Sequence, residues 1–315
     1  MSGKYEEIDL ENVKAFSIDE RVSKVRQADF GKPVKGGKPF KRWVDSLPDQ
    51  LAVKELGKLV FAMRKALSRK KYEIIWMMGA HVIKCGLSPY LIELIKKKYI
   101  TAIGTNGASV IHDLEIAFFG VTSENVSLGL DEGKFGFTEE TADLAFEAIE
   151  RGYREELGLG EAIGKFIIDE KAKWAGSSIL AQAYRFDIPF TVHLAIGTDI
   201  LHQHPGFNGS MWGDMSHRDF RIFAAKIRNL GENGGVVLNT GSAVIMPEVF
   251  LKSFSIARNI GVDFKDITMC NMDMINHYRP TQNVLCRPSA FGGESISLTG
   301  HHEIMIPLLY SSLLS

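Results

Sequence analysis

The stretch from residue 74 to residue 115 constrains the fold of this chain more than any other. A short apolar run, Glu73–Met78, ends at Gly79-Ala80, and a second run at 99–103 is followed directly by the sequence GTNGA. Between the two runs, Ser88-Pro89 is typical of a helix start. Two short strands joined by a helix predict a parallel βαβ unit. In such sheets ligands bind beyond the carboxyl ends of the strands, where the two glycine-containing loops are expected.

The rest of the chain continues this alternation of short apolar runs with helical patterns. Further strands are predicted at 188–196, 236–238 and 264–270, and helices at 51–67, 138–156, 217–230 and 247–258. Alternating strands and helices with no linker-like stretch predict one doubly wound α/β domain, with a mostly parallel sheet and helices on both faces. We place this domain at residues 48–315, after a polar arm at 1–47 that contains a Gly/Lys/Pro-rich segment at 31–41.

Composition excludes several classes of protein. Of the 315 residues 45% are hydrophobic and 24% are charged, and the net charge is −1. There is no basic excess for nucleic acid and no run of about 18 apolar residues for a membrane span. Cys85, Cys270 and Cys286 are too widely spaced for a disulfide framework or a zinc motif. We therefore expect a cytoplasmic protein with reduced thiols, no nucleic-acid partner and no membrane.

Four predicted strand ends carry loops rich in small residues, at 79–86, 104–109, 197–199 and 234–242. Glycines let backbone N–H groups approach a phosphate, and the start of a helix adds a favourable dipole. None of the loops matches G-x-G-x-x-G. Small residues in such connections are also common without any ligand, so the loops leave both interpretations open.

Histidines and carboxylates near these loops are candidates for chemistry. His202 and His204 follow Asp199 and would together offer two imidazoles and a carboxylate to a metal. They are equally compatible with hydrogen-bonded core histidines or general acid–base groups. Glu294, in the sequence FGGESISLTGHHE, is a candidate for binding a cationic substrate. Asp113 has a structural alternative, which is to cap or brace a helix.

The stretch MMGAHVIKCGLSPYLIELIKKKYITAIGTNGASVIHDLEIAF resembles the N-terminal half of deoxyhypusine synthase and its bacterial and archaeal relatives. The sequences GSSIL from 176, GGVV from 234, Arg287-Pro288 and ESIS from 294 extend the likeness over about residues 50–300. The resemblance implies a Rossmann-like homotetramer with NAD at subunit interfaces. In that family NAD oxidises spermidine, and a lysine captures the aminobutyl group as an imine before it passes to an acceptor amine.

When the family's residues are matched to this chain by position, the resemblance implies a set of dinucleotide-binding residues. It also shows that the chain lacks the family's catalytic lysine. The implied cofactor-binding residues are Gly79, Ala80, Thr105, Asn106, Gly107, Asp199, Gly234 and Gly235. The imine-forming lysine of the family is replaced by Gly300, and its tryptophan by Leu298. A glycine forms no Schiff base, so the route through a lysine at this position is absent.

These observations lead to one hypothesis with two alternatives. The first is a deoxyhypusine-synthase-like transferase that uses NAD to move an aminoalkyl group from a polyamine or related amine to a small-molecule amine. Its catalytic residues are Glu294, which binds the cationic amine, and His301, which moves protons. Asp199 binds a ribose hydroxyl or the amine. The alternatives are a metal-dependent hydrolase that uses His202, His204 and Asp199, and a homologue without catalytic activity.

Overall fold

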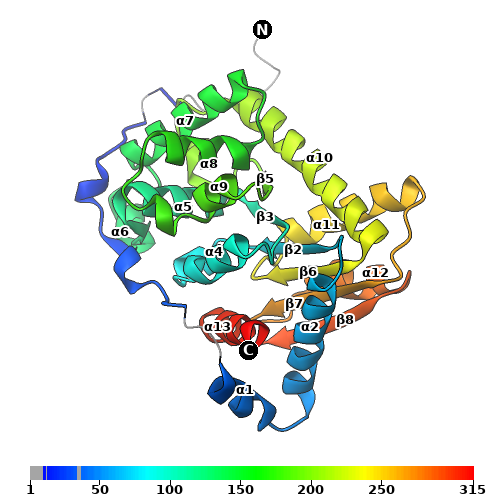
Figure 1. Cartoon of the computed structure of the whole chain (residues 1–315). Coiled ribbons are helices and arrows are strands. Elements are labelled where there is room, and N and C mark those ends of the chain that lie inside the picture. The colour runs from blue at the N-terminus through cyan, green and yellow to red at the C-terminus, as the bar shows by residue number, and fades with distance from the viewer. Residues whose placement is uncertain (1–9, 12, 34–36) are drawn as a thin grey trace.

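A six-stranded parallel sheet forms the centre of the computed structural model, which describes residues 10, 11, 13–33 and 37–315 (Figure 1). The strand order is β5-β3-β2-β6-β7-β8, and every neighbouring pair is parallel. The strands are β2 (Glu73–Met78), β3 (Ala102–Asn106), β5 (Phe190–His193), β6 (Gly235–Thr240), β7 (Ile267–Asp273) and β8 (Glu294–Thr299). The predicted doubly wound α/β class, with its parallel sheet, is confirmed.

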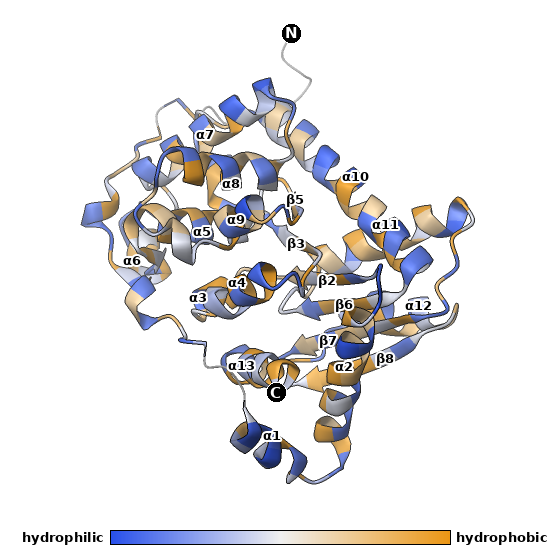
Figure 2. Cartoon of the chain, viewed as in Figure 1, coloured by the Kyte–Doolittle hydropathy of each residue, from blue (hydrophilic) through white to orange (hydrophobic). Residues whose placement is uncertain are grey.

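Helices bury both faces of the sheet. Alternate residues of β2 point to opposite faces, so that Ile74 and Trp76 join one hydrophobic core while Ile75 and Met77 join the other. The first core is closed by α2 (Leu51–Leu67), α4 (Ser88–Lys96) and α13 (His302–Leu314), and the second by α10 (Gly209–Asn233) and α11 (Ile245–Asn259). Burial on both faces explains why the central strands are continuously apolar. Hydrophobic residues accordingly concentrate on the sheet and on the helix sides that face it (Figure 2).

Further helices gather beside the β5 end of the sheet (Figure 1). They are α5 (Gly107–Phe119), α7 (Glu139–Arg154), α8 (Leu159–Asp169) and α9 (Ile179–Arg185). The shorter elements are α3 (His81–Lys84), α6 (Val126–Asp131), η3 (Ala175–Ser177), η4 (Ile200–Gln203), the π-helix η5 (Pro280–Cys286) and α12 (Arg287–Ser289). Asp113 of α5 accepts hydrogen bonds from the backbone N–H groups of Ile179 (2.8 Å) and Leu180 (3.0 Å). Asp113 therefore braces the start of α9, which is the structural alternative that the sequence left open.

The polar segment before α2 packs on its own chain. It contains η1 (Ile18–Glu20), β1 (Ser23–Arg26), η2 (Gln27–Asp29) and α1 (Lys38–Asp45), and β1 pairs antiparallel with β4 (Val121–Glu124). We call residues 17–31 the N-terminal strap. Its first turn is held by Glu140, which accepts from the backbone N–H of Ile18 at 2.6 Å, and its end by Gly31, which donates to Gly86 O at 2.8 Å. Parts of the predicted arm, residues 1–9, 12 and 34–36, lie outside the described residues.

Several strands differ from their predicted bounds: β5 spans 190–193 rather than 188–196, β7 spans 267–273 rather than 264–270, and two others affect the site. The second strand of the βαβ unit spans 102–106 rather than 99–103, and it includes Gly104. A Cβ at Gly104 would lie 2.5 Å from Met246 Cε and 2.8 Å from Phe223 Cε2, so a glycine is needed where α10 and α11 approach the sheet. The segment 294–299, expected to carry catalytic residues, is the edge strand β8. Only its Ile296 and Leu298 are buried, which gives it a weak strand signal.

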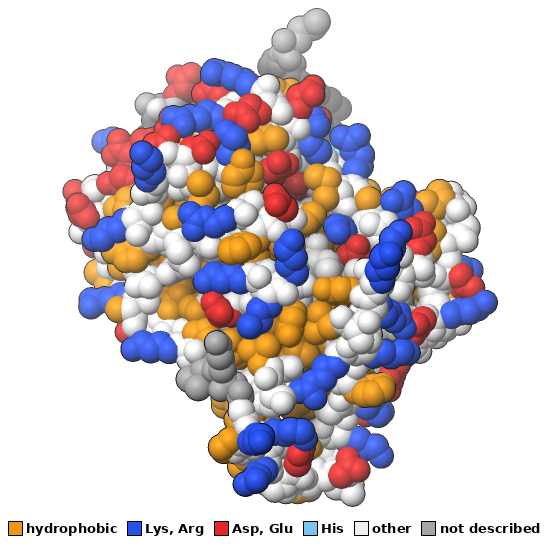
Figure 3. Space-filling view, viewed as in Figure 1, with side chains coloured by type: hydrophobic (Ala, Val, Ile, Leu, Met, Phe, Trp, Pro, Cys, Tyr) orange, Lys and Arg blue, Asp and Glu red, His pale blue; other side chains and the backbone are white. Residues whose placement is uncertain are grey.

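The outer surface mixes both signs of charge. Lysine and arginine side chains alternate with acidic ones over most of the face in Figure 3, as expected from the net charge of −1. Among the described helices, none is long and apolar enough to span a membrane.

Candidate functional site

The connections of the sheet change direction between its two central strands. From β2 the chain builds outward through β3 and β5, and from β6 it builds the opposite way through β7 and β8. A crevice at the carboxyl ends of such strands is the usual ligand site of open parallel sheets. Here the loops after β2 and β6 are in contact, since Gly79 N donates to Thr240 O at 3.1 Å and a Cβ at Gly79 would lie 2.3 Å from Gly241 O. The two loops therefore pack backbone against backbone at Gly79 and Gly241.

A cavity of about 160 Å³ lies beside this edge, next to the first turn of α5. Its walls come from the N-terminal strap, α3, α5, β4 and the loop before η4. The lining side chains that bear charge or titrate are Arg21, Lys84, His112, Glu115, Glu124 and Asp199. Segments far apart in the sequence thus place two cations, an imidazole and three carboxylates around one small volume.

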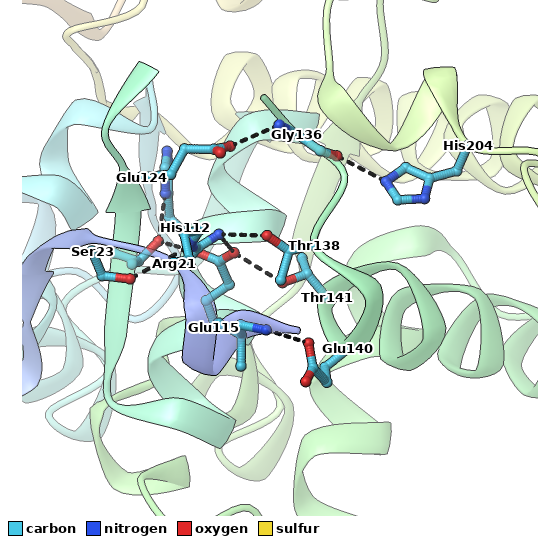
Figure 4. A network of polar contacts seen from close by, with 12 residues as sticks. Arg21, Ser23, His112, Glu115, Glu124, Gly136, Thr138, Glu140, Thr141 and His204 are labelled. Carbon is cyan, nitrogen blue, oxygen red and sulfur yellow. Dashed lines mark hydrogen bonds and ion pairs between the residues drawn. The ribbon is translucent and has the colours of Figure 1, made fainter. Parts of the chain in front are cut away.

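Arg21 and Glu115 form the buried base of the cavity (Figure 4). Arg21 Nη1 lies 2.6 Å from Glu115 Oε1, and the two side chains are 4% and 1% exposed. Arg21 Nη1 also donates to Thr138 Oγ1 at 3.2 Å, and Thr141 Oγ1 donates to Glu115 Oε1 at 2.9 Å. These two hydroxyl groups add neutral hydrogen bonds to the ion pair and help to orient the guanidinium.

His112 is oriented by a hydrogen-bonded chain that ends at the same glutamate (Figure 4). Thr122 Oγ1 donates to Glu115 Oε2, and His112 Nδ1 lies 2.7 Å from Thr122 Oγ1. The hydroxyl proton is thereby committed to Glu115, so Nδ1 carries the imidazole hydrogen and Nε2 is left as an acceptor. Burial lowers the pKa of His112 to about 4, which keeps the ring neutral at pH 7.

Two further carboxylates have pKa values raised by their environment. Burial raises the pKa of Glu124, which accepts a hydrogen bond from Gly136 N at 3.1 Å. Burial also raises the pKa of Asp199 to about 6, although the backbone N–H of Ala108 donates to it. A Cβ at Gly107 would lie 2.2 Å from Asp199 Oδ2, so the glycine leaves room for this carboxylate at the start of α5. Carboxylates with raised pKa values in a closed space are typical of functional sites.

Most of the dinucleotide-binding residues implied by the resemblance lie at this edge. Gly79 and Ala80 follow β2, Thr105 and Asn106 end β3, and Gly107 begins α5. Asp199 contacts Gly107 and also lines the cavity. Asn106 Oδ1 caps α5 by accepting from Ser109 N, at 3.4 Å. Three separate segments of the chain therefore bring these six residues to the carboxyl end of the sheet.

Gly234 and Gly235 do not join them, which corrects the sequence-based assignment. Gly235 is the first residue of β6, not the last, so it lies at the amino edge of the sheet. A six-residue strand separates the two edges by roughly 17–20 Å. Both glycines have positive φ values, and a Cβ at Gly235 would lie 1.9 Å from Glu73 O. Close approach between β2 and β6 accounts for this Gly-Gly pair without a ligand.

The two catalytic residues proposed from the sequence lie at opposite ends of β8. Glu294 begins the strand, is exposed, and lies 3.5 Å from Lys58 Nζ through its Oε1. His301 follows the strand, and its exposed ring lies 3.9 Å from Glu303. Glu294 therefore cannot act on a substrate beside His301 and is removed from the candidate site. Gly300 occupies a turn between β8 and α13, and it packs on Met305.

The histidines considered for a metal site have structural partners. His202 Nδ1 accepts from the backbone N–H groups of Gly197 at 3.0 Å and Asp199 at 3.2 Å. His204 Nε2 lies 2.8 Å from Gly136 O. Burial lowers the pKa of both rings. In the part of the chain that the structure describes, no group of three or more His, Cys, Asp or Glu residues is arranged to hold a metal ion.

Of the six charged or titratable residues of the cavity, five were not selected from the sequence. His112 is one of several histidines near predicted strand ends, but Arg21, Lys84, Glu115 and Glu124 carry no motif. Arg21 and Glu124 reach the cavity through the pairing of β1 with β4, and neither strand was predicted. The strongest available signal was the sequence TNGASVIHDLE, which places His112 one and a half helical turns after Gly107.

The fold is that of the Rossmann-like α/β proteins. A family model described as "Arginine dihydrolase ArgZ-like, C-terminal, Rossmann fold" matches residues 58–175. This match covers β2, β3 and α5, and therefore the loops at Gly79 and Gly107. No curated protein matches the sequence.

Solved structures with the same fold include enzymes that are much longer than this chain. Apo ArgZ, an arginine dihydrolase from cyanobacteria, is 16% identical with a TM-score of 0.50, and the match covers 84% of this chain and 33% of ArgZ. AgrE in complex with ornithine and NAD⁺ is 15% identical with a TM-score of 0.51, covering 89% of this chain and 34% of AgrE. The chain thus spans about a third of these two proteins.

A third neighbour is similar in length. A candidate deoxyhypusine synthase from Entamoeba histolytica is 12% identical with a TM-score of 0.51, and the match covers 95% of this chain and 96% of that protein. At these identities the likeness establishes the fold alone. That fold is the Rossmann-like one that the sequence resemblance implied.

Proposed function

We propose that this chain is an NAD-dependent enzyme that changes a carbon–nitrogen bond of a small cationic amine. The observation that carries the proposal is the position of Asp199. Its carboxylate lies against Gly107 of the proposed dinucleotide loop and also lines the cavity with Glu124. A cation bound between these carboxylates would therefore lie next to the cofactor. The solved complex of AgrE with ornithine and NAD⁺ supports this pairing of an amine with a dinucleotide.

The dinucleotide is assigned to the carboxyl edge of the sheet, where the resemblance places its loops. Gly79 and Gly107 are buried there, and a side chain at either would collide with Gly241 O or Asp199 Oδ2, so glycine lets the loops pack closely at this edge. NAD, when bound there, would supply a hydride acceptor for the carbon next to the amine. The five candidate loop residues, Gly79, Ala80, Thr105, Asn106 and Gly107, remain the groups that we assign to it.

The side chains of the cavity would then bind the amine, orient it and remove its proton. A protonated amine has no lone pair to assist the loss of hydride from its neighbouring carbon, so its proton must first be removed. Asp199, with a pKa of about 6, is ionised at pH 7 and is a suitable acceptor for this proton. His112 Nε2, a neutral acceptor, would orient a second amine N–H. Glu124 would hold the cation by charge.

Transfer of an aminoalkyl group to a small-molecule amine remains the reaction we propose. After oxidation the electrophilic carbon would be attacked by a second amine, the first amine would leave, and hydride return would restore the cofactor. With Gly300 in place of the family's lysine, this exchange would pass directly between the two small molecules. His301, exposed at the end of β8, is a secondary candidate for proton movement at the open side.

The test begins with the cofactor and proceeds to three variants. Purified protein is denatured and the released small molecules are identified by mass spectrometry. Its melting temperature is then measured with NAD⁺, spermidine, putrescine and ornithine. Asp199→Asn and Glu124→Gln should abolish the transient, enzyme-bound NADH signal that follows mixing with an amine in a single-turnover measurement, whereas Glu294→Gln should leave it unchanged. If the protein neither carries nor binds NAD⁺ and no amine shifts its melting temperature, the proposal fails, and the non-catalytic alternative holds.

A further inference from the structure

A second hollow, of about 380 Å³, lies at the amino edge of the sheet, and we call it the amino-edge hollow. Its lining includes Glu73, the first residue of β2, and Thr101, Ile188 and Asn233, which lie one or two residues before β3, β5 and β6. The length of a strand, roughly 17–20 Å, separates this edge from the carboxyl edge. The amino-edge hollow is therefore a different site from the cavity that Asp199 lines.

The charges around the amino-edge hollow are mostly positive. Its four lysines are Lys70, Lys71, Lys98 and Lys226. Lys226 is already paired, since its Nζ lies 3.3 Å from Oε1 of the buried Glu73, which also accepts a hydrogen bond from Thr101. The other three lysines are exposed and make no ion pair with any described residue. Asp187, which is exposed, is the remaining carboxylate of the lining, so three unpaired cations surround one unpaired anion.

The ends of the neighbouring helices do not account for these lysines. A cation is stabilised at the C-terminus of a helix, but the effect falls off within the last turn. Helix α2 ends at Leu67, and Lys70 and Lys71 lie about one turn beyond that end. The backbone N–H groups of Lys70, Lys71 and Tyr72 also donate to no described residue. Both the charges and these N–H groups are therefore available to an anion.

Hydrogen bonds between the segments bring the unpaired lysines to one place. Tyr72 Oη donates to Lys98 O at 2.7 Å, which joins the segment after α2 to the segment after α4. Ile74 N donates to Thr101 Oγ1 at 3.0 Å, which holds the start of β2 against the residue before β3. The fold thus gathers like charges around one hollow, and a bound anion would relieve their mutual repulsion.

We propose that the amino-edge hollow binds a small anion with two or more phosphate groups, such as a nucleoside di- or triphosphate or an inorganic polyphosphate. Several phosphate charges match three unpaired lysines, whereas a single carboxylate would leave most of them uncompensated. The half-buried rings of Tyr72 and Phe186 also line the hollow and would contact the base of a nucleotide. This site does not depend on the proposed function.

Binding of inorganic tripolyphosphate tests the proposal without a base or a ribose. Isothermal titration calorimetry of the whole chain is carried out at about 50 mM NaCl, where screening is weak. We expect the wild-type protein to bind tripolyphosphate, and Lys70→Gln/Lys71→Gln/Lys98→Gln to bind it about tenfold more weakly or less tightly still. ATP is titrated into the same two proteins. A larger loss for ATP than for tripolyphosphate identifies a nucleotide as the ligand, and an equal or smaller loss identifies an inorganic polyphosphate.

A matched variant separates this site from general attraction to positive charge. Lys14→Gln/Lys24→Gln/Lys38→Gln removes the same charge from three exposed lysines outside the amino-edge hollow, and its affinity for tripolyphosphate should equal that of the wild type. All six lysines are exposed, so both variants should keep the wild-type melting temperature without ligand. An equal loss of affinity in the two variants overturns the proposal, and so does a wild-type protein that does not bind tripolyphosphate. Displacement of tripolyphosphate by NAD⁺ would place the anion at the carboxyl edge and would also contradict it.

Discussion

Arg21 and Glu115, separated by 94 positions in the sequence, form an ion pair of 2.6 Å that joins the N-terminal strap to α5. The pair is almost fully buried and supports both the cavity wall and the chain that orients His112. The stability of the fold and the geometry of the cavity thus depend on the same ion pair.

Replacing Glu115 with glutamine should destabilise the protein strongly. The substitution keeps the shape of the side chain but leaves the buried Arg21 charge uncompensated, for which we expect a loss of about 3–5 kcal/mol in the free energy of unfolding. Denaturant titration measures it. Glu147→Gln, which breaks an exposed pair with Arg151, should change the stability by no more than about 1 kcal/mol. Similar values for the two variants would contradict the structural role assigned to the pair.

Gly79→Ala should destabilise the fold at the junction of the two central loops. Its Cβ would lie 2.3 Å from Gly241 O, so one of the loops must move, at an expected loss of about 1–3 kcal/mol and with weaker NAD⁺ binding. Gly57→Ala is the matched control, because Gly57 lies within α2 with nothing within 4 Å of the added carbon. That change should stabilise the helix by about 0.5–1 kcal/mol. Thermal unfolding and calorimetry with NAD⁺ separate the two outcomes.

The rate of amine oxidation should follow the ionisation of Asp199. Burial raises its pKa to about 6, and only the ionised form accepts a proton, so kcat/KM should increase with pH through pH 6 and then level off. Asp199→Asn should lower kcat/KM by about 10²-fold or more and remove this limb of the profile. A wild-type profile that is flat between pH 5 and 7 would exclude Asp199 as the proton acceptor.

Asp219 should make folding stability fall with rising pH between about pH 4 and pH 8. Its Oδ2 accepts backbone N–H groups of Gly160 at 3.0 Å and Val192 at 2.7 Å, and burial raises its pKa from 3.8 to about 8. Between these two values the native state binds more protons than the unfolded state, so the stability contribution is complete below pH 4 and is lost as the pH rises through 8. The slope for one proton is at most about 1.4 kcal/mol per pH unit.

Asp219→Asn provides the comparison for that measurement. The amide retains an oxygen acceptor for the backbone N–H groups but does not titrate, so its stability curve should be flatter than the wild-type curve between pH 5 and 8. Denaturant titrations at several pH values measure both curves. Parallel curves would show that Asp219 does not control the pH dependence.

Elements with strong local periodicity could be predicted from the sequence. Strand β2 was predicted with its observed bounds, Glu73–Met78, because a fully buried strand of a parallel sheet is continuously apolar. Helix α2 was predicted for a similar reason, since its buried leucines recur at helical spacing. The six carboxyl-edge residues from Gly79 to Asp199 could be grouped because parallel strands end at one edge.

Features that depend on long-range pairing could not be predicted in this way. Strands β1 and β4 have four residues each. Strand β1 alternates between half-buried and exposed positions and β4 between half-buried and buried ones, so only their mutual pairing defines them. Gly234 and Gly235 were assigned to the cofactor by position in the family resemblance, although they precede the strand predicted at 236–238 and therefore lie at its amino end. Glu294 was misassigned because an edge strand with polar alternate residues resembles a loop.

The N-terminal strap determines when the cavity forms during folding. One wall of the cavity is formed by the strap, which precedes the sheet in the chain. Its partners, Glu115 and Glu140, follow about a hundred positions later in the sequence. The cavity therefore has high contact order, and it should be among the last parts of the molecule to assemble and the first to open. A ligand bound in the cavity would then slow release of the strap, and hydrogen exchange of the β1 backbone amides would measure how far the cavity is occupied.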